Sequence, residues 1–381
     1  MSIMSSACAV DNASKANSTA STAISTAQPK PTIAAPSMPK VTPVTSSAAN
    51  RLILASNDND GDGEFANFGQ WKAVSAFMDE MVAKNGFTRA ELEAVFNQTR
   101  YIESAIKLMR PAPPGRTKNW QAYRARFIDP VRIKAGVQFW NTHADALKRA
   151  EAAYGVPAEI IVGIIGVETV YGRNTGSFRV MDVLTTLAFD YPDTPTRDAR
   201  MKFFRGEVEN ALLYARESRL DPFTLKGSYA GAIGLPQFMP SSIRQYAVDF
   251  DGNGQIDLRN SPVDAIGSVA HYLQVHGWKA GMPIVFPATV ASDTSTEDRW
   301  SAYIGQGLEA KFTLDELVAA GVVPTAALSR SASSGLRFGL VDLQNGNAPT
   351  EHWLGTDNFF AITKYNRSFF YAMSVVDLGR A

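Results

Sequence analysis

Hydrophobic residues recur at intervals of three and four positions through most of the chain that follows residue 64. This spacing places them on one face of an α-helix, whereas strict alternation is typical of a half-buried strand. Gly86 marks the end of the first predicted helix, and Thr88 followed by Glu91 forms the capping-box pattern that opens a second one. The apolar positions that predict the first helix are Trp71, Val74, Phe77, Met78 and Met81.

The later part of the chain adds more helices and a small amount of strand. Alternating apolar and polar residues predict strands at 283–286 and 336–343, with a short helix over 313–320 between them. The sequence therefore predicts a mainly α protein of the α+β class, with one small sheet. The other helical patterns cover 120–154, 197–216 and 263–276, and a last helix ends the aromatic-rich segment 359–373.

The stretch 155–172 predicts a helix that is buried on all sides. Pro157 stands where a helix favours its first turn, and Gly172 stands where a helix favours its end. The residues between them are apolar on every face, which is typical of a helix inside a core. Gly163 and Gly166 lack side chains, so we expect neighbouring helices to approach closely there. Glu168 follows at the far end of this apolar helix.

Glu168 is the strongest candidate for acid–base chemistry. Removal from water disfavours a charged carboxylate and raises its pKa, and an acid that stays protonated near neutral pH can donate a proton to a leaving oxygen. The helix alone leaves two simpler interpretations open. The carboxylate is either tied to a Lys or Arg in a buried ion pair, or it reaches solvent at the helix end.

Composition and charge exclude several functional classes. Lys plus Arg and Asp plus Glu number 37 each, so no global electric field favours nucleic acid. No apolar run is long enough to span a bilayer. Cys8 is the only cysteine and the four histidines lack close ligand spacing, so neither a disulfide framework nor a zinc site is expected. The signature loops of serine hydrolases, P-loop enzymes and dinucleotide-binding enzymes are absent.

Residues 1–63 are rich in Ser, Thr, Ala and Pro and poor in large apolar side chains, so we expect a disordered tail or tether. The small residues before Cys8 resemble the end of a bacterial lipoprotein signal, but the basic and apolar regions of such a signal are absent. Two alternatives stay open. Either the true start lies upstream and Cys8 carries a lipid anchor, or the resemblance is chance.

Two acidic loops show the alternating oxygen side chains of a calcium site. The loop at 58–64 lacks oxygen ligands at its later positions, and we interpret it as a linker. In the loop at 249–257, Gly254 supplies the turn and Asp264 is the nearest acid that closes the site. We expect structural calcium here, with an Asx-rich surface turn as the alternative. The oxygen-bearing positions are Asp249, Asp251, Asn253, Asp257 and the carbonyl of Gln255.

The segment 221–239 holds too many glycine and proline breaks for one long helix, and it places Ser228 and Gln237 on a shaped loop. Together with three other stretches, this loop resembles the membrane-bound lytic transglycosylase B family of bacterial enzymes, which cleave peptidoglycan. The stretches are I-I-G-V-E-T at Glu168, K-G-S-Y-A-G-A-I-G-L-P-Q-F-M-P-S-S in the loop, D-F-D-G-N-G-Q-I-D, and T-K-Y-N-R-S-F-F-Y-A-M near the end.

The resemblance implies a lysozyme-like catalytic core flanked by a helical domain and a small mixed α/β domain. It also implies that the protein is a monomer in the bacterial periplasm, where it binds peptidoglycan strands and no nucleic acid. If Cys8 is lipidated, the protein is an outer-membrane lipoprotein. The expected parts are a tail at 1–63, a helical domain at 64–150, the core at 151–278 with an EF-hand-like loop at 249–264, the mixed domain at 279–350, and a segment at 351–381 that returns to the core.

The resemblance further implies that Glu168 is the single catalytic acid. One extra residue between Asp257 and Asp264 departs from the family's spacing, and Leu235-Pro236 replaces smaller residues. The substrate-binding residues that it implies are Ser228, Gln237, Phe238, Tyr123, Tyr272, Tyr365, Asn366 and Tyr371. The calcium ligands that it implies are Asp249, Asp251, Asn253, Gln255 and Asp264.

The implied reaction needs one carboxylate and no cofactor. Most glycosidases use two carboxylates. Here Glu168 protonates the glycosidic oxygen between N-acetylmuramic acid and N-acetylglucosamine, and then takes the proton of the muramic C6 hydroxyl, which attacks C1 to give a 1,6-anhydro sugar. Two other classes stay open: a lysozyme-type hydrolase that uses water, and a non-catalytic wall-binding protein.

Overall fold

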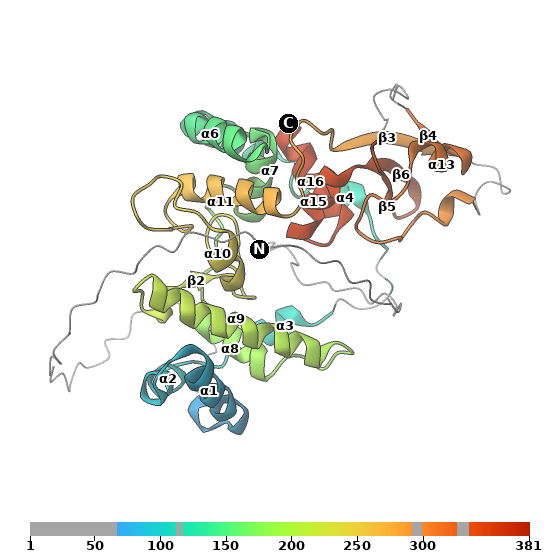
Figure 1. The fold of residues 1–381 in the computed structure, drawn as a ribbon. Helices are drawn as coiled ribbons and strands as arrows, with labels where there is room; N and C mark the ends of the chain where they lie inside the picture. The colour runs from blue at the N-terminus through green and yellow to red at the C-terminus, as the bar shows by residue number, and fades with distance from the viewer. Residues whose placement is uncertain (1–66, 112–114, 116, 292–298, 326–334) are drawn as a thin grey trace, which may run out of the picture. The chain divides into compact units, whose positions relative to one another are not determined.

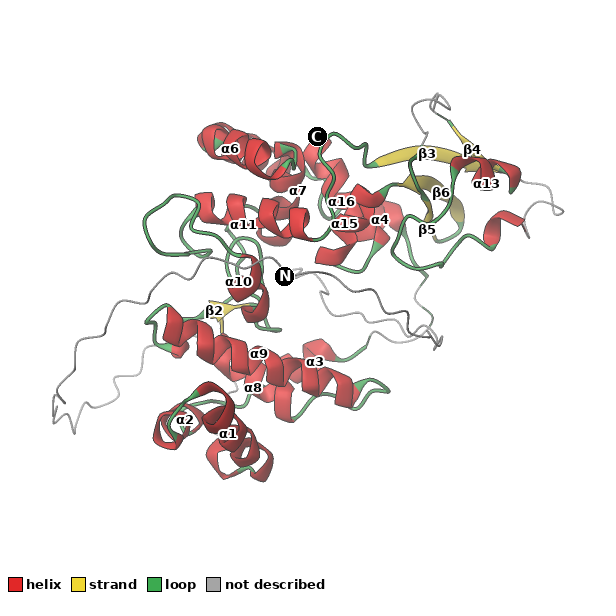
Figure 2. Cartoon of the chain, in the orientation of Figure 1, coloured by secondary structure: helices red, strands yellow, loops and turns green. Residues whose placement is uncertain are grey.

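The computed structural model describes residues 67–111, 115, 117–291, 299–325 and 335–381. These residues belong to one compact unit, and most of them lie in helices (Figures 1 and 2). The tail expected at 1–63, the loop at 58–64 and Cys8 lie outside the described residues. The helices before the central one are α1 (Lys72–Asn85), α2 (Arg89–Phe96), α3 (Glu103–Met109), α4 (Trp120–Arg124), α5 (Pro130–Thr142) and α6 (Ala144–Tyr154).

The short-range signals at the start of the chain are confirmed. Helix α1 ends at Gly86, whose φ of 67° lies in the left-handed region that glycine adopts without strain. Helix α2 begins with the capping box of Thr88 and Glu91. The helical pattern over 120–154 is broken into three helices, because Asp129 accepts hydrogen bonds from two backbone amides of a new helix start and His143 ends that helix.

Helix α7 (Ala158–Thr169) is the buried central helix, with every residue from Ile160 to Val167 buried. Helix α16 (Phe369–Arg380) packs along it. A Cβ at Gly163 would come within 2.4 Å of the Val375 carbonyl oxygen of α16, so the missing side chain permits this close approach. Helices α6 and α11 (Pro262–Val275) also contact α7 (Figure 1).

The end of α7 differs from the prediction. The helix ends at Thr169, three residues before Gly172, because Val170 already has a left-handed φ of 52°. Tyr171 and Gly172 continue in the same region, with φ values of 58° and 88°. A left-handed β-branched residue is strained, so the surrounding contacts must hold this turn.

The remaining helices surround α7 and connect it to the C-terminus. Helix α9 packs against α8 and α10, and α15 packs against α16. Pro240 occupies the first turn of its helix, where proline is favoured. The bounds of these helices are α8 (Val180–Phe189), α9 (Arg197–Glu217), α10 (Pro240–Tyr246), α13 (Leu314–Ala319) and α15 (Asp357–Tyr365), and two 3₁₀ turns, η1 and η2, cover Phe68–Gln70 and Pro222–Thr224.

Two antiparallel sheets complete the described fold. The larger has the strand order β4-β3-β6-β5, with Val285 opposite Gly355 and Ala288 opposite Pro324. The smaller pairs β1 with β2 and opens the loop that contains Ser228. Strand β6 is an addition to the prediction, since its polar residues give no clear alternation. The strands are β1 (Phe178–Arg179), β2 (Lys226–Gly227), β3 (Val285–Val290), β4 (Val322–Pro324), β5 (Gly339–Asn345) and β6 (Ala348–Gly355).

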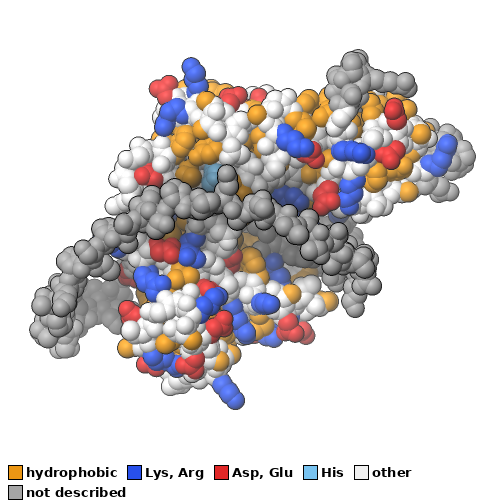
Figure 3. All heavy atoms as spheres, viewed as in Figure 1, with side chains coloured by type: hydrophobic (Ala, Val, Ile, Leu, Met, Phe, Trp, Pro, Cys, Tyr) orange, Lys and Arg blue, Asp and Glu red, His pale blue; other side chains and the backbone are white. Residues whose placement is uncertain are grey.

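The larger sheet has a small core of its own, separate from the main one. Its buried members are Ala288, Leu317, Val322, Phe338, Leu340 and Leu354. On the face shown in Figure 3, basic and acidic side chains are interspersed, in keeping with the balanced composition. Within the described ranges no single helix has the length and apolarity to cross a membrane, although α6 and α7, bent by 115° at their junction, pass that test as a pair.

Candidate active site

Glu168 lies in the last turn of α7, and its side chain is partly buried. The hydroxyl of Tyr371 donates a hydrogen bond of 2.7 Å to Glu168 Oε1. Tyr371 stands in the first turn of α16, which begins at the cap formed by Ser368, and its own side chain is 0% exposed. The packing of α16 against α7 therefore brings a fixed phenol to the carboxylate.

Burial raises the pKa of Glu168 to about 7, because the interior solvates the charged form poorly. The hydrogen bond from Tyr371 acts in the opposite direction, since it stabilises the carboxylate and lowers the pKa of Glu168. An acid with a pKa near 7 is well matched to proton transfer in both directions at neutral pH. Of the two simpler interpretations, the buried ion pair does not hold, because the described partner of Glu168 is a neutral phenol.

Three tyrosines, from α4, α15 and α16, lie near Glu168, and two further aromatic residues contact one of them. Burial and, to a smaller extent, the nearby charge of Glu168 raise the pKa of Tyr123 to about 12. Burial and the same charge also raise the pKa values of Tyr365 and Tyr371. Tyr365 and Tyr371 stack with ring centroids 6.3 Å apart, and Tyr272 and Phe238 contact Tyr365 at 4.9 and 5.8 Å.

The hydroxyls of two of these tyrosines are already used within the protein. Tyr272 donates to the Lys364 carbonyl oxygen at 2.8 Å, and Tyr365 donates to the Pro236 carbonyl oxygen. Their rings therefore present apolar edges and faces rather than free hydroxyls. Asn366 follows α15 directly and is partly buried, so it lies next to this aromatic cluster in the chain.

The loop that holds Ser228 and Gln237 is shaped by its own hydrogen bonds. Ser228 Oγ accepts hydrogen bonds from the amides of Ala230 and Ala232, at 3.3 and 3.0 Å. The Gln237 side-chain amide donates to two carbonyl oxygens, those of Thr175 and Gly234. In these bonds Ser228 Oγ is an acceptor and the Gln237 side chain is a donor, so they use neither the Ser228 hydroxyl proton nor the Gln237 carbonyl oxygen.

Thr169 is a site residue that the sequence reasoning missed. Its hydroxyl donates to the Leu235 carbonyl oxygen at 2.9 Å and accepts from the Gly172 amide at 3.0 Å. Because Thr169 follows Glu168 directly, this bond joins the end of the carboxylate's helix to the loop of Ser228 and Gln237. Its place in the motif I-I-G-V-E-T was the available signal, but the sequence does not reveal the partner.

Two other buried carboxylates have structural partners. Glu207 accepts hydrogen bonds from the amide and hydroxyl of Ser241, and so caps α10. Asp182 pairs with Arg179 and accepts a hydrogen bond from the Arg100 amide. Burial raises the pKa of each, but their oxygens are engaged at helix ends and in an ion pair. Glu168 differs because a single hydroxyl is its described hydrogen-bond partner.

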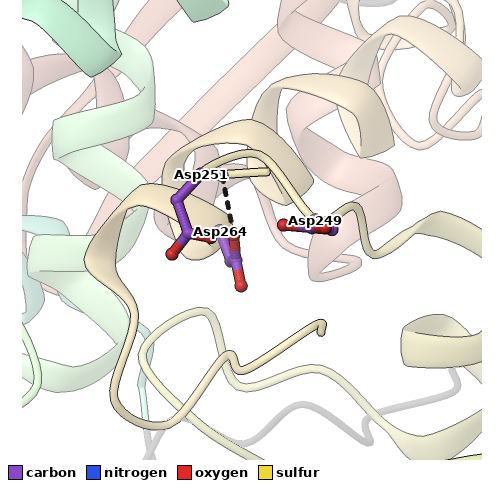
Figure 4. A group of neighbouring side chains, drawn as sticks. All are labelled: Asp249, Asp251 and Asp264. Atoms are coloured by element: carbon purple, nitrogen blue, oxygen red, sulfur yellow. Dashed lines mark hydrogen bonds between the residues drawn. The ribbon is translucent and has the colours of Figure 1, made fainter. Parts of the chain in front are cut away.

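The acidic loop brings three of its predicted ligands together. Carboxylate oxygens of Asp249, Asp251 and Asp264 all lie within 4.8 Å of one another (Figure 4). Asp264 is 0% exposed and accepts hydrogen bonds from the amides of Phe250, Asp251 and Asp257, which folds the loop around it. These hard oxygen donors fit calcium.

Two of the other predicted oxygen-bearing side chains of the loop accept local hydrogen bonds, and Asp257 is not part of that cluster of carboxylates. Asn253 Oδ1 accepts a hydrogen bond from the Gln255 amide at 2.8 Å. Asp257 turns toward Arg259 and Asn260, whose backbone amides donate to it. Asp257, the ninth position of the loop, is therefore engaged locally, and Asp249, Asp251 and Asp264 are the carboxylates that lie close together.

The known proteins that are similar to this chain are transglycosylases. The family model described as "Transglycosylase SLT domain" matches residues 69–380. The chain is 43% identical over 328 residues to the membrane-bound lytic murein transglycosylase B of Escherichia coli K12, covering 84% of each chain. The soluble lytic transglycosylase SltB1 of Pseudomonas aeruginosa is 46% identical, with a TM-score of 0.71 over 81% of this chain and 97% of that one. The Escherichia coli lytic transglycosylase Slt35 in complex with calcium is 42% identical, with a TM-score of 0.71 over 82% and 93%.

Proposed function

Because the chain belongs to the family of the transglycosylase SLT domain, we propose that it is a peptidoglycan lytic transglycosylase in which Glu168 is first the general acid and then the base. The bond cleaved is the β-1,4 linkage from N-acetylmuramic acid to N-acetylglucosamine. The observation that carries the proposal is a carboxylate with a pKa of about 7 among tyrosines, at the end of a buried helix. It is joined to a loop whose polar groups are aimed by internal hydrogen bonds.

In the first step the protonated Glu168 gives its proton to the glycosidic oxygen. The bond from C1 to that oxygen breaks, its electron pair stays on the leaving N-acetylglucosamine, and positive charge develops at C1. Desolvation keeps Glu168 protonated near neutral pH, so the acid is ready when the substrate arrives. The hydrogen bond from Tyr371 stabilises the carboxylate that this step leaves behind.

The developing charge at C1 is met by the substrate's own 2-acetamido group. Ser228 is suited to orient that group, because its oxygen already accepts two backbone amides and its proton remains to donate to the acetamido carbonyl. The free carbonyl oxygen of Gln237 is suited to accept a hydrogen bond from the sugar. The loop thereby supplies the orientation that a second carboxylate supplies in many glycosidases.

In the second step the carboxylate of Glu168 takes the proton of the muramic C6 hydroxyl. The oxygen of that hydroxyl attacks C1 and closes the 1,6-anhydro ring, and Glu168 returns to its protonated form without consuming water. The sugars are expected to lie against the partly buried rings of Tyr123 and Tyr365, with Asn366 beside them. The buried rings of Phe238 and Tyr272 contact Tyr365 and support it from behind. This aromatic surface favours the internal hydroxyl, since it limits the access of water to C1.

The test is a digest of purified peptidoglycan with the products identified by mass spectrometry. The wild-type protein is expected to release anhydro-muropeptides, and Glu168→Gln is expected to release none. Glu159→Gln is the matched control, because Glu159 lies at the opposite end of the same helix. Products that contain an added water would instead identify a hydrolase, and binding without release would identify a wall-binding protein.

We also propose that the loop at 249–264 binds structural calcium through Asp249, Asp251 and Asp264, with Asn253 and the carbonyl of Gln255 as further ligands. Three carboxylates within 4.8 Å of one another repel, and a divalent cation relieves that repulsion. The ion would hold the loop against the start of α11, and no catalytic step passes through it. Slt35, which is similar to this chain, has been solved in complex with calcium.

The proposed place of action is the bacterial periplasm, where peptidoglycan lies. The Escherichia coli relative is named a membrane-bound enzyme. A lipid anchor at Cys8 would place this chain in the outer membrane, and mass spectrometry of the N-terminal peptide from cells tests for it. We propose a monomer, because one chain contains all the residues to which the mechanism gives a role.

A further inference from the structure

A cavity of 490 Å³ lies beside the loop of Ser228 and Gln237, and the mechanism gives it no role. Its wall combines polar and apolar groups, and Leu108, on the apolar side, is 54% exposed. The lining residues that matter here are Leu108, Arg173, Asn174, Ser177, Phe178 and Tyr229.

The cavity borders the proposed active site through two direct contacts. The Thr175 carbonyl oxygen, in the segment that lines the cavity, accepts the hydrogen bond from Gln237. A Cβ at Gly176 would come within 2.1 Å of the Gly227 carbonyl oxygen, so this segment lies directly against the chain that leads into Ser228. A group attached to a sugar near Ser228 is therefore within reach of the cavity.

Arg173 is the charged residue among those that line the cavity. Its side chain is exposed, and it forms no ion pair with another of the described residues. The turn that holds it is fixed, because the Asn174 amide donates to the Thr169 carbonyl oxygen at 2.9 Å and the Gly172 amide donates to the Thr169 hydroxyl. The guanidinium is thus presented from a rigid segment that starts directly after the helix of Glu168.

We propose that this cavity binds the peptide that the muramic acid carries, with Arg173 paired to a carboxylate of that peptide. The proposal rests on the function proposed above. The N-acetylated sugars of the glycan are neutral, so the peptide is the part of an intact strand that supplies free carboxylates. A guanidinium binds a carboxylate through two parallel hydrogen bonds, which a sugar hydroxyl does not reproduce.

The rest of the wall suits a short peptide better than another sugar. Leu108 and Phe178 offer apolar surface for small alkyl side chains, and Asn174 and Ser177 offer hydrogen bonds to a peptide backbone. Arg173 therefore acts on specificity: it selects strands that still carry their peptides, and Glu168 cleaves them.

The test compares two soluble substrates of equal glycan length, one with its peptides and one from which an amidase has removed them. For Arg173→Ala, kcat/KM on the peptide-bearing strands is expected to fall about tenfold through KM, the size of one lost charge-assisted contact. On the stripped strands kcat/KM is expected to stay unchanged. Arg173→Lys keeps the charge without the planar guanidinium. Its kcat/KM on the peptide-bearing strands is expected to lie between the values of the wild type and Arg173→Ala.

Arg110→Ala is the matched control, because Arg110 is an exposed arginine next to the end of α3 that does not line the cavity. If Arg173→Ala and Arg110→Ala lower kcat/KM on the peptide-bearing strands equally, the effect is a general electrostatic attraction and the proposed pairing is wrong. Equal losses on both substrates, or no loss on either, also overturn it. A loss confined to stripped strands would place the freed lactyl carboxylate at Arg173 instead. Failure of the wild-type protein to cleave stripped strands and intact strands alike would overturn the proposed function itself.

Discussion

Replacing Glu168 with Gln is predicted to abolish catalysis and, above neutral pH, to stabilise the fold. In the folded protein the pKa of Glu168 is raised from 4.5 to about 7, so the folded state binds this proton more tightly than the unfolded chain does. Below about pH 4.5 Glu168 is protonated in both the folded and the unfolded state, so it does not lower the free energy of unfolding. As the pH rises toward 7 the Glu168 carboxyl ionises first in the unfolded chain, and the wild-type protein loses stability.

The size of the effect follows from the same shift. A change in pKa from 4.5 to about 7 corresponds to about 3 kcal/mol of unfolding free energy. This value is an upper bound, because part of the side chain of Glu168 reaches solvent. Gln has nearly the same shape, and its carbonyl oxygen can accept the hydrogen bond that Tyr371 donates. The variant therefore keeps the contact and removes only the titration.

The assay is urea denaturation of wild type and Glu168→Gln at a series of pH values, with the difference in unfolding free energy plotted against pH. We expect the difference to grow in favour of the variant between about pH 4.5 and pH 7 and to level off above that. Glu159→Gln, at the opposite end of the same helix, is measured in parallel as the control. A difference that does not change with pH would refute the argument that burial raises the pKa of Glu168.

Three further predictions test separate parts of the structure. Tyr371→Phe removes a hydrogen bond that lowers the pKa of Glu168. The alkaline limb of the pH profile of kcat/KM should therefore move up by about one pH unit. A limb that does not move would show that Tyr371 does not tune the pKa of Glu168. Asp251→Asn should weaken calcium binding, and the rise in melting temperature with added calcium should shrink; an equal rise in both proteins would exclude this residue as a ligand. Gly163→Ala should lower the free energy of unfolding, measured in urea, by about 1–3 kcal/mol, because the added Cβ meets a backbone carbonyl of α16. Gly206→Ala is the control and should not lower it, because a Cβ there meets nothing within 4 Å.

Short-range patterns in the sequence predicted much of the fold and the central residue of the site. The left-handed glycine at Gly86 and the capping box at Thr88 depend on residues within one turn, so their signals are complete in the local sequence. The apolar run of α7 identified a buried helix and made Glu168 conspicuous at its end. The alternation of Asp249 and Asp251 likewise indicated an ion-binding loop, because its backbone hydrogen bonds are local.

The sequence could not place the partners that give Glu168 its chemistry. Tyr371 lies 203 positions away along the chain, and it meets the carboxylate only because α16 packs on the glycines of α7. The early end of α7 and the bond from Thr169 to Leu235 depend in the same way on contacts between distant segments. The pKa of a buried carboxyl group depends on how far the whole fold excludes water from it. The sequence therefore identified the candidate acid, and only the tertiary packing decided how far burial raises its pKa and which hydroxyl meets it.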